Sequence, residues 1–284
     1  MDTRVLILSA SLGEGHRQAS VAIEDELRRQ CPSATVHVAD FGEFLNHTFY
    51  SLMRFGYLQS LRLAPRIYGD FYRRTMAIAP DSRVQRRLNR LGLAALHGFI
   101  ADYDPDLVIC TYPTPAGVLS RLRELGATRV PVATIVTDYT VHSQWLHPAV
   151  DMYFVGAEQI REAVIQRGFD PARIHATGIP IRHQFAEPLD RRAARQQLGL
   201  DPDRPVLLLM GGAYGVLPRL GKMPRLLRGL PPEVQVLVVC GRDPRSYRRF
   251  QREALACDLG RMRVFGFVEP VHLFMAASDL VVTK

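Results

Sequence analysis

Short apolar runs alternate with longer segments of helical periodicity along most of the chain. In the first half, the strand-like runs are residues 5–10, 35–41, 106–112, 131–139 and 151–157. A helix is expected between the first two runs, from about Gln18 to Gln30. Strands that alternate with helices favour parallel pairing, and a parallel sheet is covered by helices on both faces. The pattern therefore predicts a doubly wound α/β domain.

A second series of apolar runs follows a polar, charged stretch. Its strand-like runs are residues 206–212, 234–241, 263–268 and 279–283. The motif "TGIPI" closes the first half, so the boundary is placed near Pro180. Two similar α/β domains, 1–180 and 181–284, are expected to face each other across a cleft. The last strand ends the chain without the helix that normally covers it, so the second domain is predicted to be incomplete.

The segment from 46 to about 96 lacks this alternation. Aromatic and aliphatic residues are mixed there with arginines such as Arg54, Arg62 and Arg66, and acidic residues are rare. Basic heads beside apolar faces suit a helix that lies in an anionic lipid interface. Ordinary helices that pack on the sheet and expose a solvated arginine face are the alternative.

Composition adds a basic bias to this picture. The 284 residues are 47% hydrophobic and carry a formal net charge of +8. This balance favours a polyanionic partner such as nucleic acid, a phosphorylated ligand or an anionic membrane surface, without choosing among them. There is no signal peptide and no apolar stretch of about 18 residues, which predicts a cytoplasmic protein whose membrane contact is peripheral. None of the four cysteines forms a CxxC pair, which argues against a zinc knuckle or a thioredoxin-type motif.

The first strand ends in a glycine loop. Gly13 and Gly15 fit the first two positions of a dinucleotide-binding GxGxxG turn, but Gln18 stands where the third glycine belongs, and the stretch holds no P-loop. Asp40 ends the second strand but has no other support as a ribose-binding acid. His16 directly follows the glycines, where helix amides attract negative charge and an imidazole can accept a proton near neutral pH. A capping or packing role for His16 is the alternative.

A second polar cluster lies at the carboxyl end of another strand. Thr137 and Asp138 end a strand-like run, and His142 and Trp145 follow closely. Because ligands of open α/β sheets bind at the carboxyl ends of strands, Asp138 is expected to share one rim with His16. The spacing does not fit a metal motif, so no metal ligand is predicted. An exposed Trp145 would suit a lipid or sugar contact, and a buried Trp145 is the alternative. For His142, the alternative to a ligand contact is a structural hydrogen bond within the loop.

Glycines also follow the strands of the second half. Gly211, Gly212 and Gly215 come after the run 206–212 or at its end, and such a loop is suited to a diphosphate. The segments "VVCGRD" and "GFVEP" follow the next two strands. Each signal is weak by itself, because glycine after a strand is also common for steric reasons.

Several of these segments occur in one order along the chain. They are "SASLGEGHRQAS", "VTDYTVHSQW", "TGIPI", "LLLMGGAYG", "VVCGRD" and "VFGFVEPVHLFMAASDLVVTK". In this order they resemble the processive diacylglycerol glycosyltransferases and the plant monogalactosyldiacylglycerol synthases, relatives of the lipid II N-acetylglucosaminyltransferase. The resemblance implies the GT-B architecture, an α/β fold of two doubly wound parallel-sheet domains that face a cleft. The second domain would hold a nucleotide sugar and the first a lipid acceptor.

The resemblance also implies roles for individual residues. His16 matches the family's glycine-loop histidine, proposed as the base for the acceptor hydroxyl, and Asp138 would orient the acceptor or support that base. The residues implied on the donor side are Gly211 and Gly212 at the diphosphate, and Gly241, Arg242, Phe267 and Val268 around the uracil. The residues implied on the acceptor and membrane side are Gly13, Gly15, His142, Trp145, Arg54, Arg62 and Arg66.

The predicted function is inverting transfer of a hexose from a UDP-sugar to diacylglycerol, as a step of glycolipid biosynthesis. The resemblance implies no bound metal and no other cofactor, because the UDP-sugar is a co-substrate. The expected partners are the UDP-sugar donor, the diacylglycerol acceptor and an anionic membrane surface, and no nucleic acid. The expected location is the cytoplasmic side of the cell membrane, held peripherally.

The family pattern continues beyond this chain. In the family, the strand ending "VVTK" runs into a Pro-Gly-Gly turn and a helix whose acid contacts the donor, whereas this chain stops at Lys284. The donor site is therefore expected to lack a wall, and the choice between glucose and galactose stays open. A nucleotide-sugar epimerase or hydrolase of the same fold is one alternative function. A non-catalytic lipid-binding fragment is the other.

Overall fold

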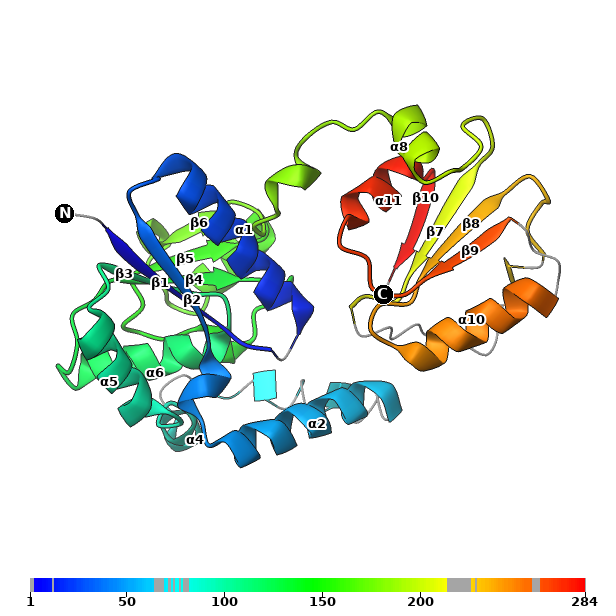
Figure 1. Ribbon diagram of the computed structural model, residues 1–284. Coiled ribbons are helices and arrows are strands. Elements are labelled where there is room, and N and C mark those ends of the chain that lie inside the picture. Colours follow the sequence, from blue (N-terminus) through cyan, green and yellow to red (C-terminus); the bar gives the residue numbers. More distant parts are fainter. Residues whose placement is uncertain are drawn as a thin grey trace. The chain divides into compact units, whose positions relative to one another are not determined.

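Two separate parallel β-sheets organise the chain, one in the unit Met1–His183 and one in the unit Gln184–Lys284 (Figure 1). The two units divide after His183, three residues beyond the boundary expected near Pro180. The computed structural model describes residues 3–11, 13–63, 69–70, 73, 75–76, 78, 82–213, 226–227, 229–256 and 261–283.

The first unit contains a six-stranded sheet in the order β2-β1-β3-β4-β5-β6, and every neighbouring pair is parallel. Its strands are β1 (Arg4–Ser9), β2 (Thr35–Asp40), β3 (Leu107–Cys110), β4 (Val132–Val136), β5 (Met152–Val155) and β6 (Ile174–Ala176). All but β6 were expected from the apolar runs. β6 has three residues, and only Ile174 is buried, so it leaves too short a pattern in the sequence.

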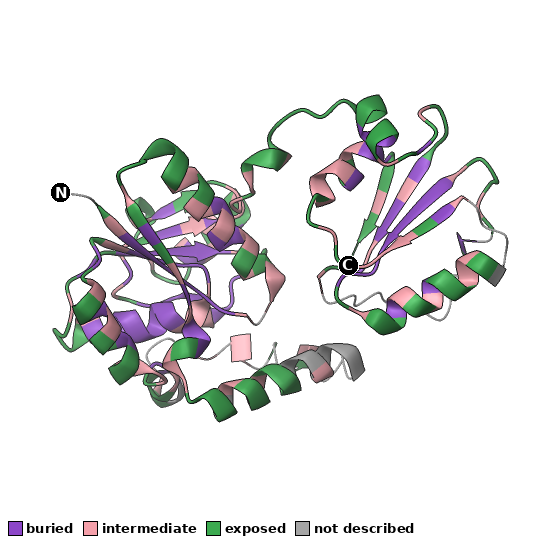
Figure 2. Ribbon diagram, in the orientation of Figure 1, coloured by how far each residue is buried: buried purple, intermediate pink, exposed green. Residues whose placement is uncertain are grey.

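Helices cover both faces of this sheet. The helices of this unit are α1 (Glu14–Gln30), α2 (His47–Leu63), α4 (Arg83–Leu88), α5 (Leu93–Tyr103), α6 (Pro113–Glu124) and α7 (Glu158–Ile165), with 3-10 turns η1 (Phe41–Phe44), η2 (Ser143–Trp145) and η3 (Pro171–Arg173). A fourth 3-10 turn, η4 (His183–Phe185), spans the division between the two units. Side chains alternate along β1: Val5 and Ile7 pack toward α1, whereas Leu6 and Leu8 pack toward α5 and α6. Burial on both faces explains the continuous apolar runs (Figure 2).

The first helix begins earlier than the sequence pattern indicated. α1 starts at Glu14 rather than near Gln18, with Gly13 as its N-cap and no side-chain cap. Because the usual Ser, Thr, Asp or Asn cap is absent, the sequence signal for the start is weak. His16 consequently lies in the first turn of α1.

The second unit repeats the arrangement with four parallel strands in the order β10-β7-β8-β9. Its elements are α8 (Arg191–Gln197), β7 (Val206–Met210), β8 (Gln235–Val239), α10 (Pro244–Ala256), β9 (Met262–Phe265), α11 (Val271–Ala277) and β10 (Leu280–Thr283). Phe274 of α11 packs on one face of the sheet and Phe250 of α10 on the other. The predicted α/β class with parallel, doubly wound sheets is confirmed.

Three expected strands of the second unit end earlier than the apolar runs. β7 ends at Met210, β8 at Val239 and β9 at Phe265. Gly211, Gly212 and Gly241, and likewise the segment 266–268, therefore belong to loops at the carboxyl ends of these strands. This is where the site residues of that half were expected to act.

Candidate active site

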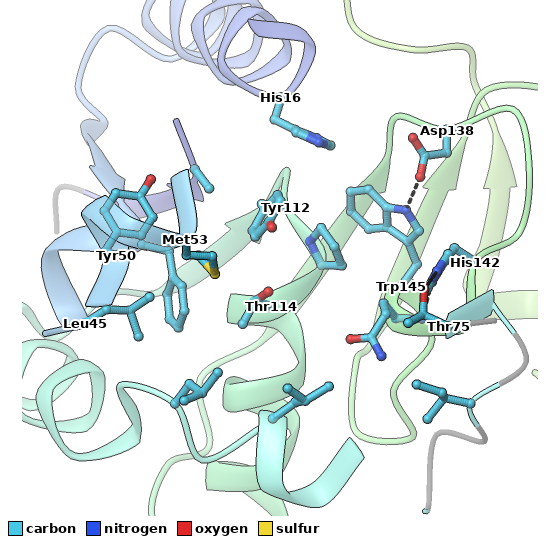
Figure 3. Close-up of a pocket in the computed structure, with 17 residues that line it drawn as sticks. His16, Leu45, Tyr50, Met53, Thr75, Tyr112, Thr114, Asp138, His142 and Trp145 are labelled. Atoms are coloured by element: carbon cyan, nitrogen blue, oxygen red, sulfur yellow. Dashed lines mark hydrogen bonds between the residues drawn. The ribbon is translucent and has the colours of Figure 1, made fainter. Parts of the chain in front are cut away.

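A cavity of about 400 Å³ opens in the first unit, at the carboxyl ends of its strands (Figure 3). Its wall is mostly apolar, and the residues that form it are Ala10, His16, Phe41, Leu45, Tyr50, Met53, Thr75, Ile78, Leu88, Leu91, Tyr112, Pro113, Thr114, Asp138, His142, Gln144 and Trp145. The structure thus brings His16 and Asp138 together, as expected from their positions at strand ends, and His142 and Trp145 line the same cavity. Cavities of this size and character hold small organic ligands.

The imidazole of His16 has a defined orientation. Its Nδ1 lies 2.9 Å from the carbonyl oxygen of Thr111 and 2.9 Å from the hydroxyl oxygen of Thr137. A carbonyl oxygen only accepts hydrogen bonds, so Nδ1 carries the proton and donates it to Thr111. Nε2 then has a free lone pair. The rings of Tyr112 and Trp145 lie 5.1 and 5.8 Å from the imidazole, centroid to centroid, and keep it in place.

The protonation state of His16 follows from its surroundings. Burial lowers the pKa of the imidazole below 6.5, while the negative charge of Asp138 and the hydrogen bond to Thr111 oppose that shift. The net lowering favours the neutral ring at pH 7. A neutral imidazole with its Nε2 lone pair available is the form that accepts a proton from a substrate hydroxyl.

Asp138 is held by the indole of Trp145. The indole Nε1–H donates to the carboxylate at 2.8 Å (Figure 3). Trp145 is only 1% exposed, so the structure shows the burial alternative rather than an exposed tryptophan. The aromatic ring still forms part of the cavity wall, so Trp145 both holds the Asp138 carboxylate and bounds the cavity.

His142 lines the cavity and uses both ring nitrogens in hydrogen bonds within the protein. Its Nδ1 accepts the backbone N–H of Gln144 at 3.1 Å, which caps η2. Nε2 therefore carries the proton and donates to the hydroxyl of Thr75 at 3.1 Å, while the Ser143 hydroxyl donates to the Thr75 carbonyl at 3.2 Å. His142 lines the cavity but also joins η2 to the segment at Thr75, which corresponds to the structural alternative for this histidine.

The two loop glycines differ in their surroundings. A Cβ on Gly13 would lie 3.5 Å from Cδ2 and 3.9 Å from Nε2 of His16. The absence of a side chain at Gly13 therefore keeps the Cδ2–Nε2 edge of the imidazole accessible. A Cβ on Gly15 would meet nothing within 4 Å, so packing gives no reason for glycine at that position.

In the second unit, the loops after β7 and β8 touch directly. A Cβ on Gly241 would lie 2.6 Å from the carbonyl oxygen of Ala213, and closer still to that of Gly212. The backbone N–H of Arg242 donates to the Ala213 carbonyl at 2.7 Å, and that of Gly211 donates to Val239 at 3.1 Å. Gly241 has φ +60°, so glycine is required there for both space and conformation.

A cation and an aromatic ring lie beside these loops. The guanidinium carbon of Arg242 is 4.1 Å from the ring centroid of Phe267, and Phe267 is 40% exposed. Val268, the next residue, packs against the core of the unit. The residues expected around a uracil thus follow the carboxyl ends of β8 and β9. Among them, Arg242 supplies a charged group and Phe267 an aromatic ring.

The α2 helix presents an apolar and basic surface. Leu52 is 69% and Phe55 is 61% exposed, Arg54 between them is exposed, and the helix contains no acidic residue. The side chain of Arg62, and Arg66 as a whole, lie outside the described residues. Within the described part of the chain, no helix has the length and apolar character needed to span a membrane.

Metal ligands were not expected, and the described residues contain no group of three or more His, Cys, Asp or Glu side chains arranged to hold an ion.

Sequence reasoning did miss several residues of the site. The carbonyl of Thr111 and the ring of Tyr112 both follow β3, and polar residues after that strand were the available signal. Tyr50 lines the cavity from α2, and no strand-end rule points to it.

Comparison with known proteins gives one family and several similar folds. The family described as "Monogalactosyldiacylglycerol (MGDG) synthase" matches residues 16–181. Processive diacylglycerol beta-glucosyltransferases of Staphylococcus saprophyticus and Bacillus licheniformis are each 28% identical to the chain, over 99% of it and over 70% and 72% of their own lengths. The enzyme of Staphylococcus epidermidis is 29% identical, over 99% of the chain and 70% of its own length.

Solved structures agree at the level of the fold. HepE of Anabaena, in complex with UDP-glucose, has a TM-score of 0.55 at 16% identity, covering 98% of this chain and 72% of that one. MnaA of Staphylococcus aureus, in a structure with UDP, has a TM-score of 0.56 at 11% identity, covering 99% of this chain and 73% of that one. These likenesses confirm the predicted two-domain GT-B fold.

Proposed function

The chain belongs to the monogalactosyldiacylglycerol synthase family, and we propose that it transfers a hexose from a UDP-sugar to the free hydroxyl of diacylglycerol. The family match confirms the resemblance drawn from the sequence motifs. The names of the curated relatives supply the acceptor and the type of reaction. The structures of HepE and MnaA, solved with UDP-glucose and UDP, support a uridine nucleotide as the donor.

The orientation of His16 is the observation that carries the proposal. Its Nδ1–H is directed to the Thr111 carbonyl, which leaves Nε2 available to a ligand in the cavity. Burial keeps the pKa of the ring below 6.5, so the base is unprotonated at neutral pH. The mostly apolar wall around it suits the glycerol and first methylenes of a lipid better than a sugar or a peptide.

The transfer follows from this arrangement. The acceptor hydroxyl oxygen bonds to the anomeric carbon as the bond from that carbon to the UDP oxygen breaks, and the electron pair leaves with UDP. Nε2 of His16 takes the hydroxyl proton and later releases it to solvent. Attack on the side opposite the leaving group inverts the anomeric configuration. Asp138 stabilises the protonated imidazole through its charge.

The donor is assigned to the loops of the second unit. Gly211 and Gly212 follow β7, where backbone N–H groups can face a diphosphate. Arg242 supplies a positive charge, and Phe267 beside it offers a face on which a uracil can stack. Gly241 keeps the two loops in contact.

Membrane attachment is assigned to α2. Its exposed Leu52 and Phe55 lie beside exposed Arg54, a combination suited to an anionic lipid surface. This supports peripheral attachment to the cytoplasmic face of the membrane, where both the lipid acceptor and a UDP-sugar are accessible.

The transfer is proposed to need no metal or other cofactor. The leaving diphosphate gains charge that Arg242 and backbone amides can stabilise, and the UDP-sugar is itself consumed as a co-substrate. Transfer measured in excess EDTA should equal that in its absence. A loss of transfer in EDTA that Mg²⁺ or Mn²⁺ restores would contradict this part of the proposal.

The main test is an assay of this chain with radiolabelled UDP-glucose or UDP-galactose and vesicles that contain diacylglycerol. His16→Ala should lower lipid glycosylation by about a hundredfold or more, with the affinity for UDP unchanged. His97→Ala is a matched control, because His97 is exposed and bonds the Ala127 carbonyl, away from the cavity. Wild-type turnover in His16→Ala would exclude it as the base.

The same assay separates the alternatives. Epimerised or hydrolysed nucleotide sugar formed without an acceptor would identify an epimerase or hydrolase of the same fold. Vesicle binding without measurable affinity for UDP would identify a lipid-binding fragment.

A further inference from the structure

The carboxylate of Asp40, at the end of β2, is the centre of a hydrogen-bond network beside the cavity. Oδ2 accepts the backbone N–H of Ser11 at 3.0 Å and also the Ser11 hydroxyl. Oδ1 accepts the backbone N–H of Gly42 at 2.8 Å and the hydroxyl of Tyr50 at 3.1 Å. The ribose-binding role considered for Asp40 is therefore not needed to explain its position, since both oxygens serve the protein itself.

Tyr50 closes the network from α2. Its hydroxyl donates to Asp40 and accepts the same Ser11 N–H at 3.2 Å. Its ring packs against Gly42, where a Cβ would come within 2.6 Å of Cδ1 of the ring and closer still to Cε1 and Cζ. Burial and the charge of Asp40 raise the pKa of Tyr50 to about 12, so the hydroxyl remains a donor at any physiological pH.

This network joins two parts of the molecule that the proposed reaction uses. Ser11 lies two residues before Gly13, the N-cap of the helix that carries His16. Tyr50 lies near the start of α2, whose outer face exposes Leu52. Tyr50 and His16 also line the same cavity (Figure 3). Hydrogen bonds through Asp40 thus join α2 to the residues in front of His16.

We propose that Asp40 and Tyr50 are positioning residues that lock the glycine loop to α2, so that the seating of α2 on a lipid surface sets the geometry of His16. The inference rests on the proposed function for its catalytic consequence. Its structural consequence is that the loop exchanges its amide hydrogens more slowly when α2 binds lipid. This consequence does not depend on any reaction. Each of the two residues acts on His16 through its hydrogen bond to the Ser11 backbone N–H.

Tyr50→Phe is the decisive variant, because it removes only the hydroxyl and leaves the ring on Gly42. Tyr103→Phe is its matched control: the Tyr103 hydroxyl bonds the Thr35 carbonyl at 3.5 Å, at the opposite end of β2. Ser11→Ala is a second variant, which removes the hydroxyl bond to Asp40 while keeping the amide. It keeps the test valid if Tyr50→Phe fails to fold.

The first readout is hydrogen exchange of the segment 8–20, with and without anionic vesicles. Loss of one hydrogen bond should raise exchange at Ser11 about fivefold in Tyr50→Phe. Vesicles should increase protection of this segment in the wild type and in Tyr103→Phe, but not in Tyr50→Phe. Equal exchange in Tyr50→Phe and Tyr103→Phe, with and without vesicles, would overturn the proposal.

The second readout is steady-state transfer. In Tyr50→Phe, kcat on vesicles should fall about tenfold through misplacement of the base, with KM for the UDP-sugar unchanged. The stimulation by vesicles over a dispersed short-chain diacylglycerol should be lost. A variant that only destabilised the fold would lower both rates together. If the wild type shows no transfer at all, the proposed function fails, and the exchange experiment still decides the link between α2 and the loop.

Discussion

Replacing Gly241 with alanine should separate the two loops that we assign to the donor. The added Cβ would lie 2.6 Å from the Ala213 carbonyl oxygen, so the backbone contact must open by about 1 Å to reach an ordinary separation. Alanine at φ +60° costs about 1 kcal/mol in addition. If the shifted loop loses one charge-assisted backbone bond to the diphosphate, the affinity for UDP should fall by about 10- to 100-fold.

Gly199→Ala is the matched control in the same unit. Gly199 has φ +63°, so alanine carries the same conformational cost. Its Cβ would meet only the flexible tip of Arg263, at 3.2 Å. Both variants should lose stability in thermal unfolding, and Gly241→Ala should lose more because its Cβ also meets backbone carbonyls. Only Gly241→Ala should lose UDP affinity in calorimetry. Equal UDP affinity in the two variants would refute the assignment of these loops to the donor.

Further predictions concern the first unit. Asp138→Asn removes the charge that raises the pKa of His16, so the acid limb of the kcat-against-pH profile should move to lower pH; an unmoved limb would show that Asp138 does not act on this base. Trp145→Phe removes the indole donor to Asp138, and denaturant unfolding should show a loss of about 1–3 kcal/mol. Phe55→Glu places a charge on the exposed face of α2, and co-sedimentation with anionic vesicles should fall about tenfold or more. Tyr139→Phe, at an exposed aromatic residue in the loop after β4, is the control and should leave co-sedimentation unchanged.

The sheets could be predicted because their strands are buried on both faces. The run at Val5 to Leu8 reads as uninterrupted apolar sequence, since alternate side chains enter different cores. The start of α1 was placed too late because Gly13, and not a capping side chain, precedes it. β6 escaped notice because a single buried residue, Ile174, leaves no period to detect.

The site was predictable only where a rule links sequence position to space. His16 and Asp138 follow different strands, and the carboxyl ends of parallel strands meet at one edge. Tyr50 reaches the same cavity from a helix. The rule that site residues follow strand ends therefore could not identify it. Asp40 drew attention as an acid at a strand end, but its hydrogen-bond partners depend on tertiary packing that no local pattern records.

The bond that orients His16 has a consequence for how the enzyme tolerates mutation. The acceptor is the main-chain carbonyl of Thr111, which every amino acid supplies. The side chain at that position bonds the Ser20 hydroxyl at 2.7 Å instead. Genetic drift at position 111 can thus change local packing without deleting the group that selects the imidazole tautomer. An accepting carboxylate is lost through one codon change, whereas the Thr111 carbonyl is lost to His16 only when the path of the backbone itself moves.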